Sequence, residues 1–146
     1  MSPQIRDVMV ENVITVDPKT TAREAAKLMK QHDIGCLIVV QDSRPIGIVT
    51  ERDMLNRVLI ELKNPQKTKV EEIMSTPLTV VQPQTDIQDA AEIMLKTKIK
   101  KLPVIEDGDL AGLVTLTDLV FFYYYKKTPQ PVKVIDYLEG MVTKQV

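Results

Sequence analysis

The sequence predicts a protein of the α/β (α+β) class, built from two copies of one β-α-β-β-α unit. The first observation behind this prediction is an internal repeat, because many residues recur 65 positions later without a gap. The second is a pair of helix-like apolar stripes, and the third is two pairs of short apolar runs separated by turn residues. The identical positions include Met9 and Met74, Val16 and Val81, Pro18 and Pro83, Ala25 and Ala90, Met29 and Met94, Leu37 and Leu102, and Gly47 and Gly112.

Each unit begins with an amphipathic turn and a short extended piece. The turns are Ile5–Met9 and Val70–Met74, and each ends in a methionine. The extended pieces are Val13–Val16 and Leu78–Val81, and a proline closes each of them two residues later. Because proline cannot continue a hydrogen-bonded strand, we expect each extended piece to be brief.

The first helix of each unit carries its apolar residues on one face, with the i, i+3, i+4, i+7 spacing of an amphipathic helix. Thr or Ser three residues before Glu or Gln is typical of a capping box at a helix start. The stripes are Ala22, Ala25, Ala26 and Met29 in the first unit and Ile87, Ala90, Ala91 and Met94 in the second; the expected capping boxes are Thr21 with Glu24 and Thr85 with Gln88.

Two strands and a closing helix complete each unit. The strand pairs are apolar on both faces, which is typical of strands covered by other elements, and turn residues such as Asp42–Pro45 and Asp107–Asp109 join them. The expected strands are Cys36–Val40, Ile46–Thr50, Leu102–Ile105 and Leu110–Thr115, and the expected closing helices are Arg52–Leu62 and Thr117–Tyr125.

Composition places the chain among ordinary globular proteins. Of its 146 residues, 44 % are apolar and 27 % are charged, and the net charge is −1, so no global field favours nucleic acid or an anionic membrane. No window has the apolar length of a membrane span, and the sequence from Met1 to Gln4 lacks the apolar region of a signal peptide. A lone cysteine, Cys36, excludes an internal disulfide and fits a reducing compartment. We therefore expect a cytoplasmic protein.

The sequence Gly47–Asp53 and its copy Gly112–Asp118 are the strongest candidates for a binding site. In both copies a glycine and two apolar residues precede a Thr, and an Asp follows three positions later. A Thr at a helix start exposes free N–H groups that suit an anion, and an Asp one turn later can accept hydrogen bonds from sugar hydroxyls. The same spacing also fits two capping boxes that serve only the helices themselves. Both interpretations remain open at this point.

The tandem β-α-β-β-α unit, its opening Met, its buried hairpin and its Gly-apolar-apolar-Thr-x-x-Asp sequence together resemble the cystathionine-beta-synthase (CBS) domain family. The resemblance covers roughly residues 4–125 and divides the chain into CBS motif 1 (1–63), a linker (64–68), CBS motif 2 (69–126) and a C-terminal extension (127–146). It implies a single CBS-pair domain, often called a Bateman module. In such a pair the two motifs pack sheet to sheet around a pseudo-twofold axis and leave two clefts between them.

The resemblance also implies a function. CBS pairs commonly dimerise and serve as regulatory modules that bind adenosine-containing ligands, so we expect a homodimer that binds AMP, ADP or ATP and acts through an effector protein. We expect the protein to require no cofactor, because the nucleotide would serve as a regulatory ligand. The alternatives are S-adenosylmethionine as the ligand, a protein-interaction module without a ligand, and a nucleic-acid binder that uses the basic segment Lys96–Lys101. The balanced net charge argues against nucleic acid.

The family's ligand contacts can be carried over by position. Asp53 and Asp118 would hold ribose hydroxyls, and Thr50 and Thr115 would face phosphate. The copies differ between Thr and Asp, where Arg52 in the first is replaced by Thr117 in the second, so unequal clefts and one bound nucleotide per chain are expected. Arg52 and Lys101 are candidate phosphate contacts, and the adenine would be bordered by Ile14, Thr15, Gly35, Cys36, Thr79, Val80, Lys101, Leu102 and Pro103.

Neither catalysis nor metal binding is indicated. The single histidine, His32, lies in a polar stretch, and no Cys/His cluster, Walker loop or Gly-rich dinucleotide fingerprint is present. We therefore expect a non-enzyme without a metal site. All the aromatic residues lie late in the chain, from Phe121 to Tyr137, which favours either a partner surface or packing beneath the C-terminal extension. Residues 132–142 fit a terminal helix or an added strand.

Overall fold

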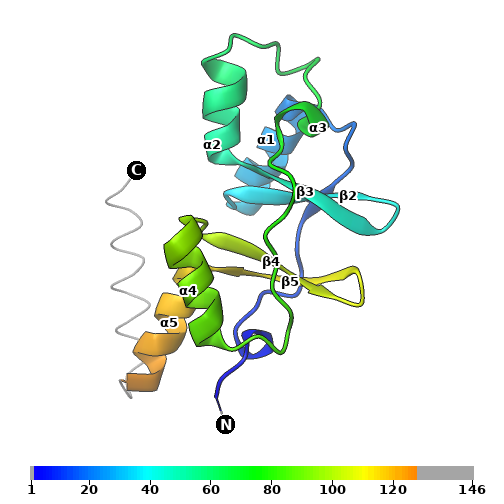
Figure 1. Cartoon of the computed structure of the whole chain (residues 1–146). Helices are drawn as coiled ribbons and strands as arrows, with labels where there is room; N and C mark the ends of the chain where they lie inside the picture. The colour runs from blue at the N-terminus through cyan, green and yellow to red at the C-terminus, as the bar shows by residue number, and fades with distance from the viewer. Residues whose placement is uncertain (1, 128–146) are drawn as a thin grey trace.

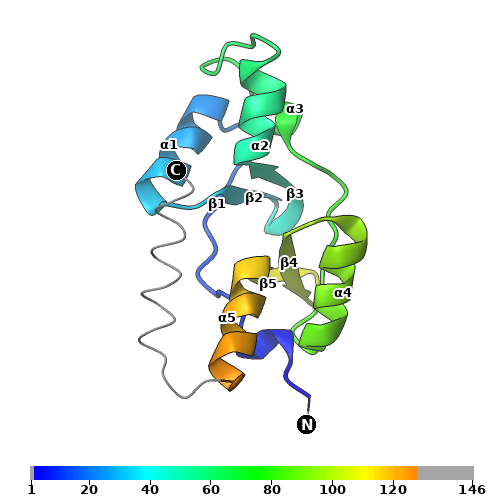
Figure 2. The same cartoon turned by 90° about the vertical axis from the view of Figure 1, so that its left-hand side faces the viewer.

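The computed structural model describes residues 2–127, which form two small sheets packed against each other with helices on their outer sides (Figure 1). Helices α1, α2 and α3 cover the first sheet, and α4 and α5 cover the second (Figures 1 and 2). Strand β3 of one sheet contacts β5 of the other. The predicted α+β class and the sheet-to-sheet packing of two related units are confirmed.

The elements follow the repeat. The first sheet has the order β1-β2-β3, with β1 parallel and β3 antiparallel to β2, and the second is the antiparallel pair β4-β5. The first unit contains η1 (Ile5–Asp7), β1 (Thr15–Val16), α1 (Ala22–His32), β2 (Cys36–Gln41), β3 (Arg44–Thr50), α2 (Glu51–Met54) and the π-helical η2 (Leu55–Leu59). The second contains α3 (Val70–Ile73), α4 (Ile87–Thr97), β4 (Lys101–Glu106), β5 (Asp109–Thr115) and α5 (Leu116–Lys127).

The hairpins are confirmed, and their strands extend slightly beyond the predicted limits. The turn between β2 and β3 needs only Asp42 and Ser43, which both have a positive φ, so that β3 already begins at Arg44. The strand register pairs Thr50 with Cys36 in the first unit and Thr115 with Lys101 in the second. Each Thr of the repeated sequence therefore lies at the end of one strand, opposite the start of its neighbour.

The extended piece Leu78–Val81 does not form the predicted strand. Only Val81 pairs with the second sheet, through a single parallel bridge to Val104. In the first unit, the N–H of Ile38 donates to the carbonyl of Ile14 and supports β1. The residue equivalent to Ile38 in the second unit is Pro103, which has no N–H to donate. The prediction failed because this substitution removes one hydrogen bond from the ladder.

Neither of the two predicted capping boxes forms in full. Thr21 accepts a hydrogen bond from the N–H of Glu24 at 3.1 Å and caps α1, but among the described residues the Thr21 N–H makes no return bond to the Glu24 side chain. Thr85 instead accepts from the N–H of Gln82 at 3.0 Å, in the turn before the helix, and α4 starts after Asp86. The repeat explains the error, because the position 65 residues after Thr21 is Asp86 and not Thr85.

Each unit's opening turn packs in the core of the other unit. Ile5 is fully buried in the second core, and its N–H donates to the carbonyl of Thr85 at 2.8 Å. Val70 and Ile73 are fully buried in the first core. The buried residues are Val16, Ala22, Ala25, Met29, Leu37, Val39, Val49, Val58, Val70 and Ile73 in the first core, and Ile5, Val81, Ile87, Ala90, Met94, Leu102, Val104, Val114 and Leu119 in the second.

The repeated glycines make this exchange possible. A Cβ on Gly47 would overlap the Sδ of Met74, and a Cβ on Gly112 would lie 2.9 Å from the Sδ of Met9. Each opening-turn methionine thus lies directly on a strand of the opposite unit, where only glycine leaves room. The predicted terminal element at 132–142 and the aromatic residue Tyr137 lie outside the described residues.

Candidate functional site

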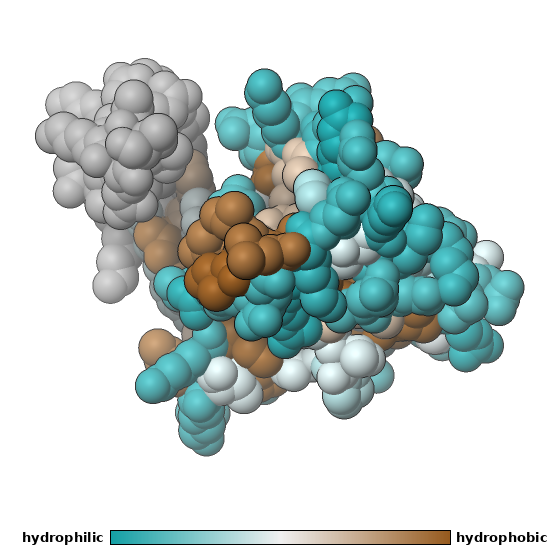
Figure 3. Space-filling model, turned by 90° about the horizontal axis from the view of Figure 1, so that it is seen from above, coloured by the Kyte–Doolittle hydropathy of each residue, from teal (hydrophilic) through white to brown (hydrophobic). Residues whose placement is uncertain are grey.

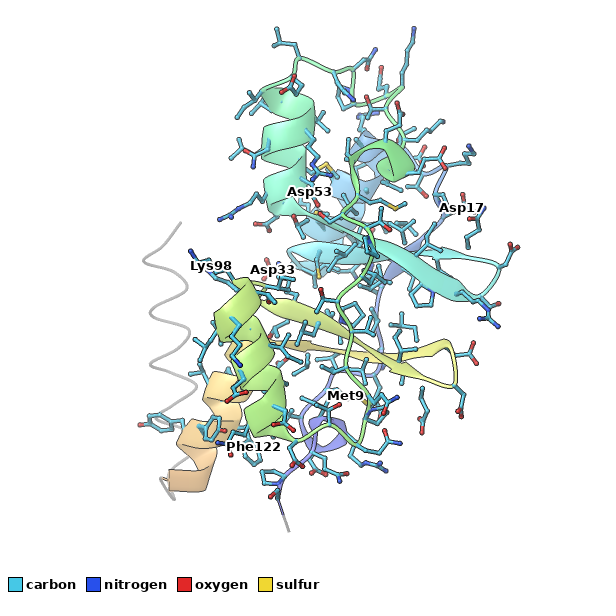
Figure 4. The ribbon with its side chains drawn as sticks, viewed as in Figure 1. Met9, Asp17, Asp33, Asp53, Lys98 and Phe122 are labelled. Atoms are coloured by element: carbon cyan, nitrogen blue, oxygen red, sulfur yellow. The ribbon has the colours of Figure 1, made fainter. Side chains whose placement is uncertain are left out.

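A cleft of about 550 Å³ lies between the two units, beside the ends of β3 and β4. Its volume is within the range of roughly 300–1,000 Å³ that is usual for small-molecule sites. Asp53, at the base of α2, and Lys98, at the end of α4, lie on facing sides of it (Figure 4). We call it the Asp53 cleft. Its lining residues are Ile48, Thr50, Glu51, Arg52, Asp53, Ser75, Pro77, Leu78, Thr79, Lys98, Ile99, Lys100, Lys101 and Pro103.

The Thr50–Asp53 pair forms a complete capping box at the start of α2. Oδ2 of Asp53 accepts from the Thr50 N–H at 2.9 Å and from the Thr50 hydroxyl at 3.1 Å, and Thr50 Oγ1 accepts from the Asp53 N–H at 3.2 Å. The capping interpretation is therefore confirmed. It does not exclude a ligand, because Oδ1 of Asp53 makes no hydrogen bond to any described residue and lies 3.8 Å from Nε of Arg57.

Thr115 and Asp118 repeat this geometry at the start of α5. Oδ2 of Asp118 accepts from the Thr115 N–H at 2.8 Å and from the Thr115 hydroxyl at 3.0 Å. The surroundings of the two carboxylates differ, however. Asp53 is buried and Asp118 is half-buried, and within residues 2–127 no cation forms an ion pair with Asp118.

The Asp53 cleft carries an excess of positive charge. Arg52, Lys98, Lys100 and Lys101 line it together with only two carboxylates, those of Glu51 and Asp53. In the described part of the chain, none of the four cations forms a salt bridge shorter than 4.0 Å. Unpaired cations around a cleft with one free carboxylate oxygen suit a ligand that has both anionic groups and hydroxyl donors.

The side chain of Lys101 extends to Gly35 of the first unit. A Cβ built on Gly35 would lie 2.9 Å from Nζ of Lys101 and 3.3 Å from Oε1 of Glu51, so Gly35 leaves the room that the lysine uses. The charge of Lys101 also affects the pKa of Cys36, which is buried. Burial raises the pKa of the Cys36 thiol, while Lys101 opposes that rise and Glu51 adds to it.

The structure brings together six of the predicted ligand residues in the Asp53 cleft and separates the others. Val80 is exposed without lining the cleft, and the side chain of Leu102 lies in the second core. The remaining seven do not line it, and all of them except Thr15 are equivalent, by the 65-residue offset, to residues that do. The six are Thr50, Arg52, Asp53, Thr79, Lys101 and Pro103, and the seven are Ile14, Thr15, Gly35, Cys36, Thr115, Thr117 and Asp118.

Several cleft residues were not predicted. Ser75, Pro77 and Leu78 belong to the irregular connection that follows α3, and Ile48 and Ile99 flank the predicted polar residues. The bridge between Ile48 and Ser75 holds the connection beside β3, with N–H to carbonyl distances of 2.8 and 3.1 Å. The sequence does offer one signal for this connection as part of the site: it directly precedes Thr79, which was predicted as a ligand residue.

Comparison with known proteins agrees with the repeat and the two-sheet architecture. The family model described as "CBS domain" matches the chain twice, over residues 5–60 and 70–125. The chain belongs to the CBS domain family. Its two matched segments make it a tandem CBS pair, so the expected resemblance is confirmed.

Individual relatives support the same assignment. The chain is 38 % identical over 115 residues to the CBS domain-containing protein YhcV of Bacillus subtilis, a match covering 79 % of this chain and 81 % of YhcV. It spans only 61–62 % of three longer relatives. A solved protein with CBS domains from Burkholderia ambifaria is 32 % identical, with a TM-score of 0.77 over 81 % of this chain and 87 % of that one.

One solved neighbour contains ligands. The CBS domain pair of protein MJ0100, in complex with 5′-methylthioadenosine and S-adenosyl-L-methionine, is 26 % identical with a TM-score of 0.78. The match covers 86 % of this chain and 99 % of that one.

Among the helices within residues 2–127, none is both long and apolar enough to cross a membrane.

Proposed function

We propose that this CBS pair is a non-enzymatic regulatory module that binds an adenine nucleotide, AMP, ADP or ATP, in the Asp53 cleft. The observation that carries the proposal is the combination of one available Asp53 carboxylate oxygen with four cations on the same cleft. The oxygen can accept hydrogen bonds from ribose hydroxyls, and the cations can bind phosphate. Apolar residues, including Pro77, Leu78 and Ile99, offer contacts to the base.

The charges also rank the possible ligands. Because the four cations outnumber the two carboxylates, binding should strengthen with each added phosphate, in the order AMP, ADP, ATP. S-adenosylmethionine carries a sulfonium cation and no phosphate, so it should bind more weakly in this cleft. It remains the ligand-level alternative, because the related MJ0100 pair binds adenosyl compounds of this kind.

Calorimetric titration with AMP, ADP, ATP and S-adenosylmethionine tests the proposal. Lys101→Met should weaken ATP binding about tenfold, since a hydrogen bond to a charged group contributes roughly 1.5–3 kcal/mol and less when it is exposed. Lys96→Met is the matched control, because Lys96 pairs with Glu92 at 3.8 Å and does not line the cleft. Equal effects of the two changes would contradict the phosphate assignment. No heat with any ligand would instead favour the interaction module without a ligand.

We further propose that the chain acts as a homodimer. The helices that close the two units expose apolar residues at equivalent positions, Leu55 and Val120 at 50 % and 48 %, and Leu59 and Tyr124 at 66 % and 42 %. These helices lie on the same side of the molecule (Figure 2). Seen from above, an apolar patch lies at the end of the molecule to which η2 belongs (Figure 3). A groove beside α5 continues the surface, lined by Ala91, Leu95, Leu116, Leu119, Val120, Tyr123 and Tyr124.

Sedimentation equilibrium tests this assembly. Leu55→Asp and Val120→Asp each place a carboxylate on the apolar side and should shift the protein toward a monomer. Glu92→Asp, an exposed change on α4, is the control. An unchanged dimer in both aspartate variants would mean that the two copies associate elsewhere.

The output of such a module must pass through another protein. We propose that nucleotide binding changes the shape of the dimer or its affinity for an effector, which is population shift between conformations that bind the ligand unequally. A cytoplasmic location is part of this proposal. Nucleic acid is a weaker candidate partner, because the net charge of the chain is −1.

A further inference from the structure

Arg57 connects the two walls of the Asp53 cleft. Its Nη1 donates to the carbonyl oxygens of Ile73 and Met74, both at 3.0 Å, while its Nε lies 3.8 Å from Oδ1 of Asp53. Asp53 belongs to the wall formed by α2. Ile73 and Met74 lead directly into Ser75, the first residue of the connection that forms a second wall of the cleft.

The contacts of Arg57 are suited to fixing both walls. The carbonyls at the end of α3 have no partner within the helix, and the planar guanidinium can reach two of them while a second edge faces a carboxylate. Asp53 is only 7 % exposed, and its Oδ2 is already held by Thr50. The Arg57 charge beside Oδ1 therefore leaves this carboxylate with both oxygens oriented.

The second unit lacks this arrangement. The residue equivalent to Arg57 is Phe122, and the residues equivalent to Ile73 and Met74 are Val8 and Met9. Phe122 packs against the second core together with Val8 and Met9. Its ring has no N–H to donate, so it supplies neither a charge to the neighbouring carboxylate nor a hydrogen bond to the opening turn. Among the described residues, only Oδ2 of Asp118 accepts hydrogen bonds.

We infer that Arg57 is a positioning residue for the Asp53 cleft and makes it bind more tightly than the second cleft that the repeat leads us to expect beside Asp118. The inference rests on the proposed function, since it concerns the same ligand. By fixing the Ser75–Thr79 wall and the Asp53 carboxylate before the ligand arrives, Arg57 reduces the ordering that binding requires. Phe122, at the equivalent position, leaves the Asp118 cleft without this preorganisation.

Two readouts on Arg57→Met, Arg57→Lys and the exposed control Arg6→Met test the inference. The first readout needs no ligand and measures amide hydrogen exchange at Ser75 and Ile48. The Ser75 N–H donates to the carbonyl of Ile48 at 2.8 Å, so its exchange reports on the attachment of the wall to β3. Arg57→Met should accelerate exchange at both amides roughly tenfold, the effect of losing about 1.4 kcal/mol of local stability. The second is the calorimetric affinity for ATP, which should fall roughly 5- to 30-fold in Arg57→Met and less in Arg57→Lys.

The possible failures are distinguishable. If ATP binds the parent and Arg57→Met with equal affinity, the inference is overturned while the proposed function stands. If the parent binds no nucleotide, the proposed function fails, and hydrogen exchange alone decides whether Arg57 holds the wall. Unchanged exchange at Ser75 and Ile48 overturns that role as well. An Arg6→Met effect as large as that of Arg57→Met would also overturn it.

Discussion

Replacing Ile5 by alanine tests the exchange of opening turns between the two units. Ile5 has no exposed surface and lies in the second core, although the repeat makes it part of the first unit. Its backbone N–H is bonded to Thr85, so the turn is anchored by both packing and hydrogen bonding. The variant keeps the backbone bond and removes only the packing.

The expected cost follows from the burial. The change removes three carbon groups, worth about 0.8 kcal/mol each on transfer from water, and the cavity left behind raises the total into the range of roughly 2–5 kcal/mol. A loss of about 3 kcal/mol should lower Tm by roughly 6–12 °C, at about 2–4 °C per kcal/mol for a chain of this size.

Thermal and urea unfolding followed by circular dichroism measure the effect. Arg6→Ala, at the exposed neighbouring position, is the control and should change stability by no more than about 0.5 kcal/mol. If Ile5→Ala is as mild as Arg6→Ala, the opening turn does not pack in the second core, and the reasoning that joins the two units through their turns is refuted.

Three further changes probe local features. Gly47→Ala should destabilise by about 1–3 kcal/mol in urea unfolding, because the new methyl group meets Met74; the double variant with Met74→Ala should recover part of that loss, and no recovery would remove Met74 as the cause. The pKa of Cys36 is raised by burial, so the unfolding free energy should fall as pH rises above about 8.5 toward the higher folded-state value, and Cys36→Ala should remove this dependence. Thr21→Ala should cost about 1 kcal/mol and speed hydrogen exchange at the Glu24 amide, while an unchanged rate there would show that the cap contributes nothing.

Local patterns in the sequence predicted the helices and hairpins because those elements depend on neighbouring residues. The helical spacing of the apolar residues, the turn residues and the constant 65-residue offset of the repeat were enough to predict α1, β2 and β3. The missing strand at Leu78–Val81 depended on a single exception to the repeat, Pro103, whose lost N–H belongs to the partner strand and not to the segment itself.

The exchange of opening turns could not be predicted from the same patterns. The repeat shows that Ile5 and Val70 are equivalent, but equivalence along the chain does not say which core each residue enters. The evidence lay in two further residues, Gly47 and Gly112, whose missing side chains leave room for a methionine of the other unit. That relation is visible only in three dimensions.

The candidate site was predictable where it coincides with the repeated motif. Thr50, Asp53 and Lys101 followed from the Thr-x-x-Asp spacing and the family resemblance. Ser75 and Pro77 did not, because they belong to an irregular connection whose place beside the cleft depends on tertiary contacts. Arg57 was missed because its carbonyl partners lie 16 and 17 residues away.

The most direct test of the central claim is an ATP titration of Asp53→Asn beside the matched variant Asp118→Asn. The asparagine oxygen can still accept from the Thr50 N–H, so the start of α2 should persist while the charged acceptor for ribose is lost. The account predicts a loss of about 10- to 150-fold in affinity for Asp53→Asn, equivalent to roughly 1.5–3 kcal/mol, and little change for Asp118→Asn. Equal affinity in the parent and Asp53→Asn would contradict it and leave the Asp53 carboxylate as a helix cap alone.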